Sequence, residues 1–124
     1  MKPIYEPHIA RIERLVSEWE PRLDLPGITV IHRYFENFGG DNDSGIIAET
    51  EVHYVYRDAV IRWYMPAVVR LDDTDLEDCL VHEYVHVLVA PMELHIPEKF
   101  KGEQNEFAVE NMARALLAVH RSKS

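Results

Sequence analysis

Hydrophobic residues in the first half of the chain change from helical spacing to alternation. Over residues 5–21 they recur three and four positions apart, which predicts an amphipathic helix that the proline at its end stops. The segment 27–38 is rich in β-branched and aromatic residues and predicts a strand. From 46 to 66, charged and apolar residues alternate over two stretches, which predicts two more strands with Arg57 and Asp58 at the turn between them.

The second half of the chain predicts two longer helices. Residues 75–90 form a mostly apolar run with acidic residues before and within its first turn, where any of residues 72–74 can cap a helix that Pro91 ends. Residues 102–122 again have apolar residues at helical spacing and predict the last helix. Its apolar positions are Val109, Met112, Ala113, Leu116 and Leu117.

The order of predicted elements is therefore one helix, three strands and two helices. This order predicts an α+β domain in which a small twisted three-stranded sheet covers the buried face of the central helix. A chain of 124 residues with 47% hydrophobic residues fits one domain that spans residues 1–124. The polar segment 39–45 predicts a solvated loop, since it lacks the length and the bidentate glutamate of a calcium loop.

The composition of the chain argues against some classes of binding partner. The formal net charge of −9 argues against nucleic acid and against an anionic membrane surface, because both require a basic patch. The single cysteine, Cys79, excludes an internal disulfide framework and is expected in the core. No segment resembles a signal peptide or is long enough to span a bilayer, so we expect a cytoplasmic protein.

Candidate chemistry lies at residues 82–86, which read His-Glu-Tyr-Val-His within the apolar run. Residues four apart on a helix share a face, so His82 and His86 can direct their ring nitrogens at one metal ion. Glu83 is rotated away from this pair but is close enough to reach a water bound to the metal. Zinc lowers the pKa of such a water to about 7, and a neighbouring carboxylate can take its proton. Polar rings on so apolar a helix are costly unless a metal or a hydrogen bond satisfies them.

The segment 82–86 resembles the HExxH zinc metallopeptidases, or zincins, with two ligands at His82 and His86 and the general base at Glu83. The resemblance implies a zincin-like fold, one Zn²⁺ ion and hydrolysis of peptide bonds in a peptide or protein substrate. The whole chain looks like a minimal gluzincin, and chains this short resemble phage-borne or bacterial intracellular metallopeptidases.

The last helix offers the strongest candidate for the third ligand that catalytic zinc usually takes. The segment 105–110, Asn-Glu-Phe-Ala-Val-Glu, resembles the gluzincin pattern, in which the first glutamate binds zinc and an acidic residue one turn later supports a histidine ligand. The resemblance therefore implies that Glu106 is a ligand and that Glu110 is the support, although aspartate is more familiar at the latter position. A helical wheel also places Glu106 nearest to the apolar face among the glutamates of this helix.

Other third ligands remain open. Glu103 lies in the first helical turn, where the macrodipole favours a carboxylate, but "EQNEFA" also resembles the ligand helix of the repressor-cleaving metallopeptidases of mobile elements. His95 comes too late for the metzincin arrangement, which also needs a glycine, yet it can bind from the following loop. Glu110 can itself bind the metal, or it can pair with Arg114 four residues on.

In zincins, an edge strand beside the active-site helix aligns an extended substrate by main-chain pairing. The segment 59–66 precedes the helix most closely and resembles that strand. Trp63 or Tyr64 can border the cleft, although aromatic residues on strands are core residues more often than not. Three histidines have no partner at ligand spacing and are expected at the surface or in structural roles: His32, His53 and His120.

Two other classes of function compete with the enzyme. One is a non-catalytic zinc- or peptide-binding module that retains the zincin fold. Glu83 counts against this class, because a site that only binds metal needs no base. The other is a metal-free interaction domain in a phage particle or a regulatory complex.

Overall fold

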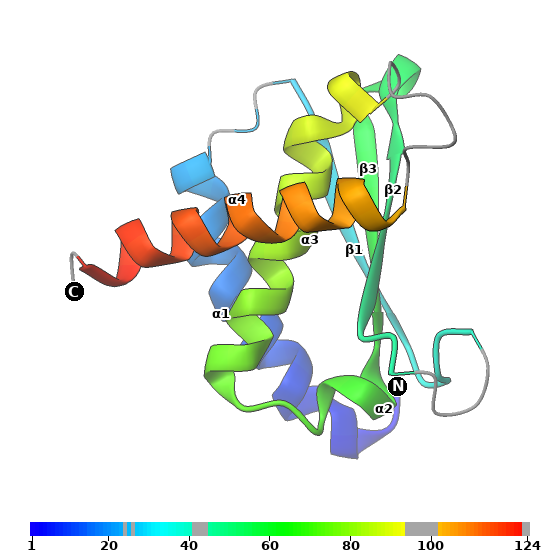
Figure 1. Ribbon diagram of the computed structural model, residues 1–124. Coiled ribbons are helices and arrows are strands. Elements are labelled where there is room, and N and C mark those ends of the chain that lie inside the picture. The colour runs from blue at the N-terminus through cyan, green and yellow to red at the C-terminus, as the bar shows by residue number, and fades with distance from the viewer. Residues whose placement is uncertain (24, 26, 41–44, 94–101, 123–124) are drawn as a thin grey trace.

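Three long helices and a three-stranded sheet form the fold (Figure 1). The computed structural model describes residues 1–23, 25, 27–40, 45–93 and 102–122. The elements in chain order are a 3-10 helix at Pro3–Tyr5, α1 (Glu6–Leu23), β1 (Thr29–Phe35), β2 (Ala48–His53), a 3-10 helix at Tyr54–Tyr56, β3 (Asp58–Tyr64), α2 (Met65–Val68), α3 (Asp73–Glu93) and α4 (Glu103–Ser122). The predicted α+β class is confirmed, and the one-turn helix α2 adds to the predicted elements.

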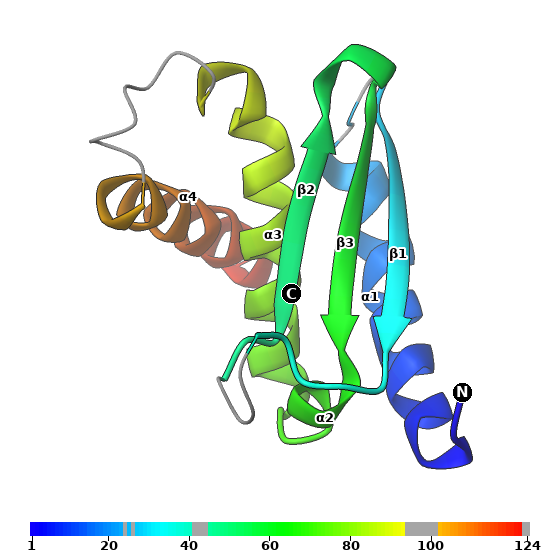
Figure 2. The ribbon, with the colours of Figure 1, turned by 90° about the vertical axis from the view of Figure 1, so that its right-hand side faces the viewer.

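The strand order is β1-β3-β2, with β1 parallel to β3 and β2 antiparallel to it. The expectation that residues 59–66 form an edge strand is therefore wrong, because β3 is the central strand. Figure 2 shows that β2 is the edge strand that lies beside α3. The turn between β2 and β3 is where the sequence predicts it, since Arg57 has the positive φ of 56° that reverses the chain before Asp58.

The described helices cover one face of the sheet. In β1 exposed positions alternate with the partly buried Val30, His32 and Tyr34, and Phe35 at the end of the strand is also partly buried. Figure 2 shows α1 and α3 behind the sheet and no described helix in front of it. The two faces of β2 therefore differ, with one turned to the helices and the other to solvent.

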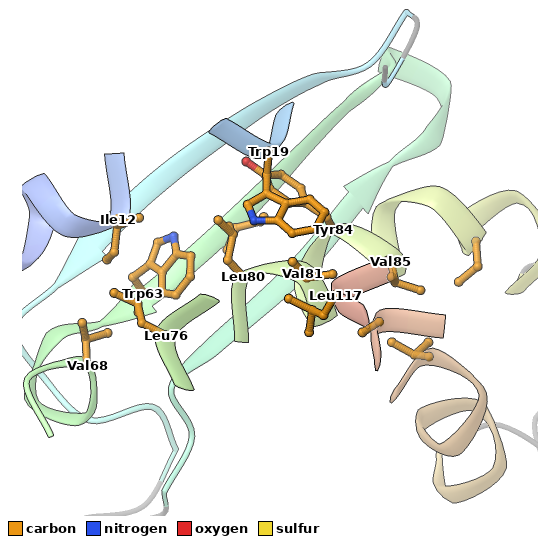
Figure 3. Packing of buried hydrophobic residues seen from close by; sticks show 14 of the residues in the cluster. Ile12, Trp19, Trp63, Val68, Leu76, Leu80, Val81, Tyr84, Val85 and Leu117 are labelled. Atoms are coloured by element: carbon orange, nitrogen blue, oxygen red, sulfur yellow. The ribbon is translucent and has the colours of Figure 1, made fainter. Parts of the chain in front are cut away.

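The core lies between α1, α3 and the sheet (Figure 3). Among its large members that are at most 2% exposed are Ile12, Trp19, Trp63, Leu80 and Tyr84. Trp63 thus belongs to the core and does not border a cleft. Cys79 is partly buried and packs against this cluster, as expected.

Helix α4 packs against α3 through one apolar face. Val109, Ala113 and Leu117 are at most 3% exposed, whereas Met112 is 46% exposed. The sequence predicts an apolar face centred near Met112, Leu116 and Val109, and the buried face of the structure is rotated from there towards Ala113. This rotation also places Glu106 and Glu110 on the side of α4 that borders α3.

Two helices continue past a proline that the sequence predicts as their end. Helix α1 runs to Leu23 with Pro21 inside it, and α3 runs to Glu93 with Pro91 inside it. The predicted ends are therefore early by two residues: a proline loses one helical hydrogen bond and crowds the carbonyl four residues before it, and each helix ends within the same turn. The predicted cap is confirmed, since Asp72 accepts a 2.8 Å hydrogen bond from the backbone N–H of Asp75. Among the described helices, none is long and apolar enough to cross a membrane.

Candidate metal site

Three donor side chains from α3 and α4 meet at one point. Nε2 of His82 lies 2.9 Å from one carboxylate oxygen of Glu106, and Nε2 of His86 lies 3.0 Å from the other. The three residues each offer a ligand atom within 4.8 Å of the other two. The structure thus brings the two histidines of the motif together with the glutamate that the sequence analysis favours, and this group can hold a metal ion.

Local geometry and packing position the donors. His82 and His86 are four residues apart on α3, so their rings lie side by side with centroids 5.1 Å apart. The opposite side of α3 is held in the core by Leu80 and Tyr84, which are fully buried. The histidines therefore face out of the core, where α4 crosses α3 (Figure 1).

Glu110 supports His82 from the turn after Glu106. Its carboxylate lies 2.8 Å from Nδ1 of His82 and accepts a 3.0 Å hydrogen bond from Arg114 through its other oxygen. Burial alone would raise the pKa of Glu110, but the hydrogen bonds from His82 and Arg114 lower it below the ordinary value. Glu110 is therefore an ionised acceptor, and Nδ1 of His82 donates to it. The two roles considered for Glu110, histidine support and pairing with Arg114, coexist.

The donor set fits a metal ion. A neutral imidazole carries one proton, and the proton of His82 is on Nδ1, so its Nε2 turns a lone pair towards an oxygen of Glu106. Nε2 of His82 and the Glu106 oxygen are then both acceptors. At 2.9 Å apart they require either a second proton or a cation between them. Burial lowers the pKa of His82, but the hydrogen bond to Glu110 and the charges of Glu83 and Glu106 outweigh burial and raise it. The same negative surroundings that favour a proton favour a divalent cation.

Glu83 is buried beside the donors and is held by the sheet. Its side chain is 7% exposed, and one of its carboxylate oxygens accepts a 2.9 Å hydrogen bond from the hydroxyl of Thr50 on β2. Burial raises the pKa of Glu83, and this effect exceeds the opposing hydrogen bond from Thr50 and the charges of His86 and His82. Thr50 is not among the site residues that the sequence predicts. It could have been recognised because, among the alternate positions of β2 that turn to the helices, Thr50 is the one with a polar side chain.

A pocket joins the donors to the edge of the sheet. Its described lining comes from β2, α3 and α4 and consists of Ala48, Glu49, Thr50, His82, Glu83, His86 and Glu106. No lysine or arginine belongs to this described lining. The pocket is therefore strongly acidic, and Glu83, the possible metal donors and the edge strand all border the same space.

Two of the alternative ligands cannot be placed in the site. His95 lies outside the residues that the structure describes. Glu103 is the first residue of α4, but its side chain is also outside the described part. Of the candidates whose side chains are described, Glu106 is the one that contacts both histidines, while Glu110 contacts Nδ1 of His82.

His32 has a structural role, as expected. Trp63 donates a 3.1 Å hydrogen bond to Nδ1 of His32, and Nε2 of His32 lies 3.2 Å from Glu20. The hydroxyl of Tyr84 donates to the same carboxylate oxygen of Glu20 at 2.8 Å. This network joins α1, the sheet and α3 on the side of Tyr84, away from the metal donors.

His120 has a structural role, as expected, with partners that are distant in sequence. Together with Glu18 and Glu77 it forms a second group that can hold a metal ion, with Nε2 of His120 at 3.0 Å from Glu18. Both oxygens of Glu77, however, already accept hydrogen bonds, one from Trp19 at 2.9 Å and one from Arg121 at 3.2 Å. The guanidinium supplies the positive charge there, and the network joins α1, α3 and α4.

In comparisons with known proteins, the chain matches no protein-family model, no curated protein and no solved structure. The site combines two histidines, one shared glutamate, a supported imidazole and a buried carboxylate in one pocket.

Proposed function

We propose that this protein is a zinc-dependent metallopeptidase with a zincin-like arrangement of α3 and α4. The observation that supports the proposal most is the position of the Glu106 carboxylate, which offers one oxygen to Nε2 of each histidine in the HExxH segment. Glu83 of the same segment lines the same pocket. The three donors and the base of a peptidase site thus lie together.

Two imidazoles and one carboxylate are a ligand set that catalytic zinc uses, and three protein ligands leave a further position for water or substrate. Zinc at such a site lowers the pKa of a water that it binds and polarises a carbonyl oxygen. Glu110 keeps the Nδ1 proton of His82, so that Nε2 presents its lone pair to the metal. Arg114 holds the second oxygen of Glu110 and so restricts its orientation.

Glu83 acts as the general base and then as the general acid. It accepts a proton from the attacking water as the water oxygen bonds to the peptide carbonyl carbon, and it delivers that proton to the leaving nitrogen as the carbon–nitrogen bond breaks. Thr50 holds one carboxylate oxygen through its hydroxyl and leaves the other oxygen to carry the proton. Thr50 is therefore a positioning residue.

The substrate is a peptide or protein in an extended conformation. Strand β2 pairs with β3 along one edge, and no described strand pairs with its other edge. Because Ala48, Glu49 and Thr50 line the pocket, that free edge borders the donors. An extended chain that pairs with β2 would bring a peptide bond alongside the metal and Glu83. The role that the sequence analysis gave to residues 59–66 thus passes to β2.

The test has two measurements. Protein purified without added metal is analysed for zinc, with one ion per chain expected. Cleavage of a broad peptide library is then compared for wild type, Glu83→Gln and Glu13→Gln, a matched change at an exposed residue of α1. General acid–base catalysis contributes at least about a hundredfold, so Glu83→Gln should lose activity by that factor while it retains zinc, and Glu13→Gln should match wild type.

The proposal fails if zinc-loaded wild type cleaves no member of the library, or if Glu83→Gln cleaves as fast as wild type. Zinc binding without cleavage would identify the non-catalytic module instead. Absence of bound metal under all loading conditions would leave the interaction domain.

A further inference from the structure

One acidic residue of the pocket lining has no part in metal binding or in proton transfer. Glu49 lies on β2 next to Thr50 and lines the pocket together with the donors and Glu83. Residues alternate along β2, so the exposed side chains of Glu49 and Glu51 lie on the solvent face while Thr50 is turned to the helices. Glu49 is thus at the free edge of the sheet, one residue from the group that holds the general base.

The Glu49 carboxylate is fixed in place. The hydroxyl of Tyr64 donates a 2.7 Å hydrogen bond to one of its oxygens. Tyr64 is only 9% exposed, and its ring packs so closely on Gly39 that a Cβ added there would lie 2.6 Å from a ring carbon. A closely packed aromatic ring therefore holds one oxygen of Glu49 and leaves the other for a ligand.

Glu51 lies on the same face of β2 as Glu49, but unlike Glu49 it has a positively charged partner among the described residues, Arg62. Glu51 accepts a 2.9 Å hydrogen bond from Arg62 and lies 2.9 Å from Nε2 of His53. Arg62 is opposite Glu49 in the strand register, yet it bonds to Glu51 instead. Within the part of the chain that the structure describes, no ion pair involves Glu49.

The pocket as a whole also lacks positive charge. Its described lining contains three acidic residues, Glu49, Glu83 and Glu106, and no lysine or arginine, with the Glu49 carboxylate on the solvent face of β2 at the rim. These carboxylates outnumber the two charges of one zinc ion. A cationic group on the substrate would therefore neutralise the charge of Glu49, which is the one of the three carboxylates that neither binds metal nor transfers protons.

We infer that Glu49 selects a lysine or arginine side chain at the substrate residue that pairs opposite it on the free edge of β2. This inference rests on the proposed function. Side chains opposite each other on neighbouring strands lie on the same face with Cβ atoms about 4.5–5.5 Å apart, and opposite charges there attract. Because Glu49 adjoins Thr50, which contacts Glu83, the selected residue lies about one or two residues from the scissile bond. The substrate class is thus an extended peptide with a basic residue beside the cleaved bond.

The experiment uses blocked decapeptides of alanine, serine and threonine in which one position at a time carries lysine, arginine, norleucine or citrulline. Binding is measured by calorimetry on the zinc-loaded Glu83→Gln variant, and kcat/KM is measured on wild type. Lysine and arginine at one position should bind about tenfold more tightly than the neutral residues of similar length. Adding Glu49→Gln should abolish that difference and leave the affinity for the norleucine peptide unchanged.

Two further variants serve as controls. Glu13→Gln removes the same charge from the exposed face of α1 and should keep the preference. Tyr64→Phe keeps the Glu49 carboxylate but removes the hydroxyl that bonds to it, so the carboxylate is no longer fixed. This variant should reduce the preference for lysine and arginine about two- to threefold.

The outcomes separate the two proposals. If wild type cleaves peptides but treats lysine, arginine, norleucine and citrulline alike within twofold, or if Glu49→Gln keeps the preference, the inference is wrong and the peptidase stands. If basic peptides bind in a way that depends on Glu49 but none is cleaved, the peptidase proposal fails and the assignment of Glu49 stands. If zinc-loaded protein binds and cleaves none of the peptides, both fail.

Discussion

The hydroxyl of Thr50 donates a 2.9 Å hydrogen bond to the carboxylate of Glu83, and this contact joins the edge of the sheet to the HExxH helix. Glu83 is 7% exposed, so water cannot easily replace the lost donor if Thr50 is changed. The orientation of the Glu83 carboxylate therefore depends on a strand that is more than thirty residues away in sequence.

Replacing Thr50 by valine should lower kcat. Valine keeps the shape of the side chain but removes the donor, and a hydrogen bond to a charged group contributes about 1.5–3 kcal/mol, which corresponds to roughly a ten- to hundredfold change in rate. Steady-state kinetics on zinc-loaded protein measure the effect, with KM expected to change little. Thr50→Ser keeps the hydroxyl and should retain most of the activity. Equal kcat in Thr50→Val and wild type would remove Thr50 from the mechanism.

Replacing Glu106 by glutamine should weaken zinc binding by at least about a hundredfold, since loss of a ligand should cost no less than loss of an outer-shell partner. The variant retains the size of the side chain but not the charge that lies between His82 and His86. Competition with a chromogenic chelator measures the affinity.

The alternative ligands provide the control for that measurement. Glu103→Gln and His95→Ala should bind zinc as wild type does. If either of them loses zinc while Glu106→Gln retains it, the third ligand has been assigned wrongly.

Replacing Glu110 by glutamine should weaken zinc binding by about 10–100-fold, the usual cost of removing an outer-shell partner of a metal-bound histidine. The reason is that Nδ1 of His82 would lose the ionised acceptor that keeps its proton. Arg114→Ala is the matched control, because Arg114 is 73% exposed and its pair with Glu110 is a surface ion pair of small effect. Equal affinities in Glu110→Gln and Arg114→Ala would contradict the support role.

His32 should make the stability of the metal-free protein depend on pH. Burial lowers the pKa of His32 below its ordinary value of 6.5, and the hydrogen bond and charge of Glu20 oppose this only in part. The unfolded chain therefore takes up the proton first as pH falls. The stability that neutral His32 contributes is complete above pH 6.5 and decreases as pH falls from there through the pKa of the folded state. Glu20 on α1 and Tyr84 on α3 are the ionisable groups in contact with the ring.

The measurement is the free energy of unfolding in urea, with a chelator present, at several values between pH 8 and pH 5. Replacing His32 by glutamine removes the titrating group and should lower stability at neutral pH by about 1–3 kcal/mol, the usual cost of a broken buried hydrogen-bond network. The difference between the two proteins should become smaller towards acid. A difference that stays constant with pH would show that His32 does not titrate in this range.

The sequence by itself determined the parts of this protein that depend on neighbours along one helix. His82 and His86 must share a face because they are four residues apart in a helix with an apolar run around them. The periods of the hydrophobic residues determined which segments are helices and strands and so the α+β class. The resemblance of residues 105–110 to a ligand pattern pointed to Glu106 before its distance to the histidines could be known.

Tertiary structure alone decided the contacts that cross between elements. Strand order depends on how the chain returns to the sheet, and alternation within a strand is the same at the edge and at the centre, so periodicity could not tell that β2 rather than β3 borders the site. The bond from Thr50 to Glu83 and the partners of His120 join residues far apart in sequence. Such contacts follow from the packing of helices on one face of the sheet, which is why sequence spacing could not predict them.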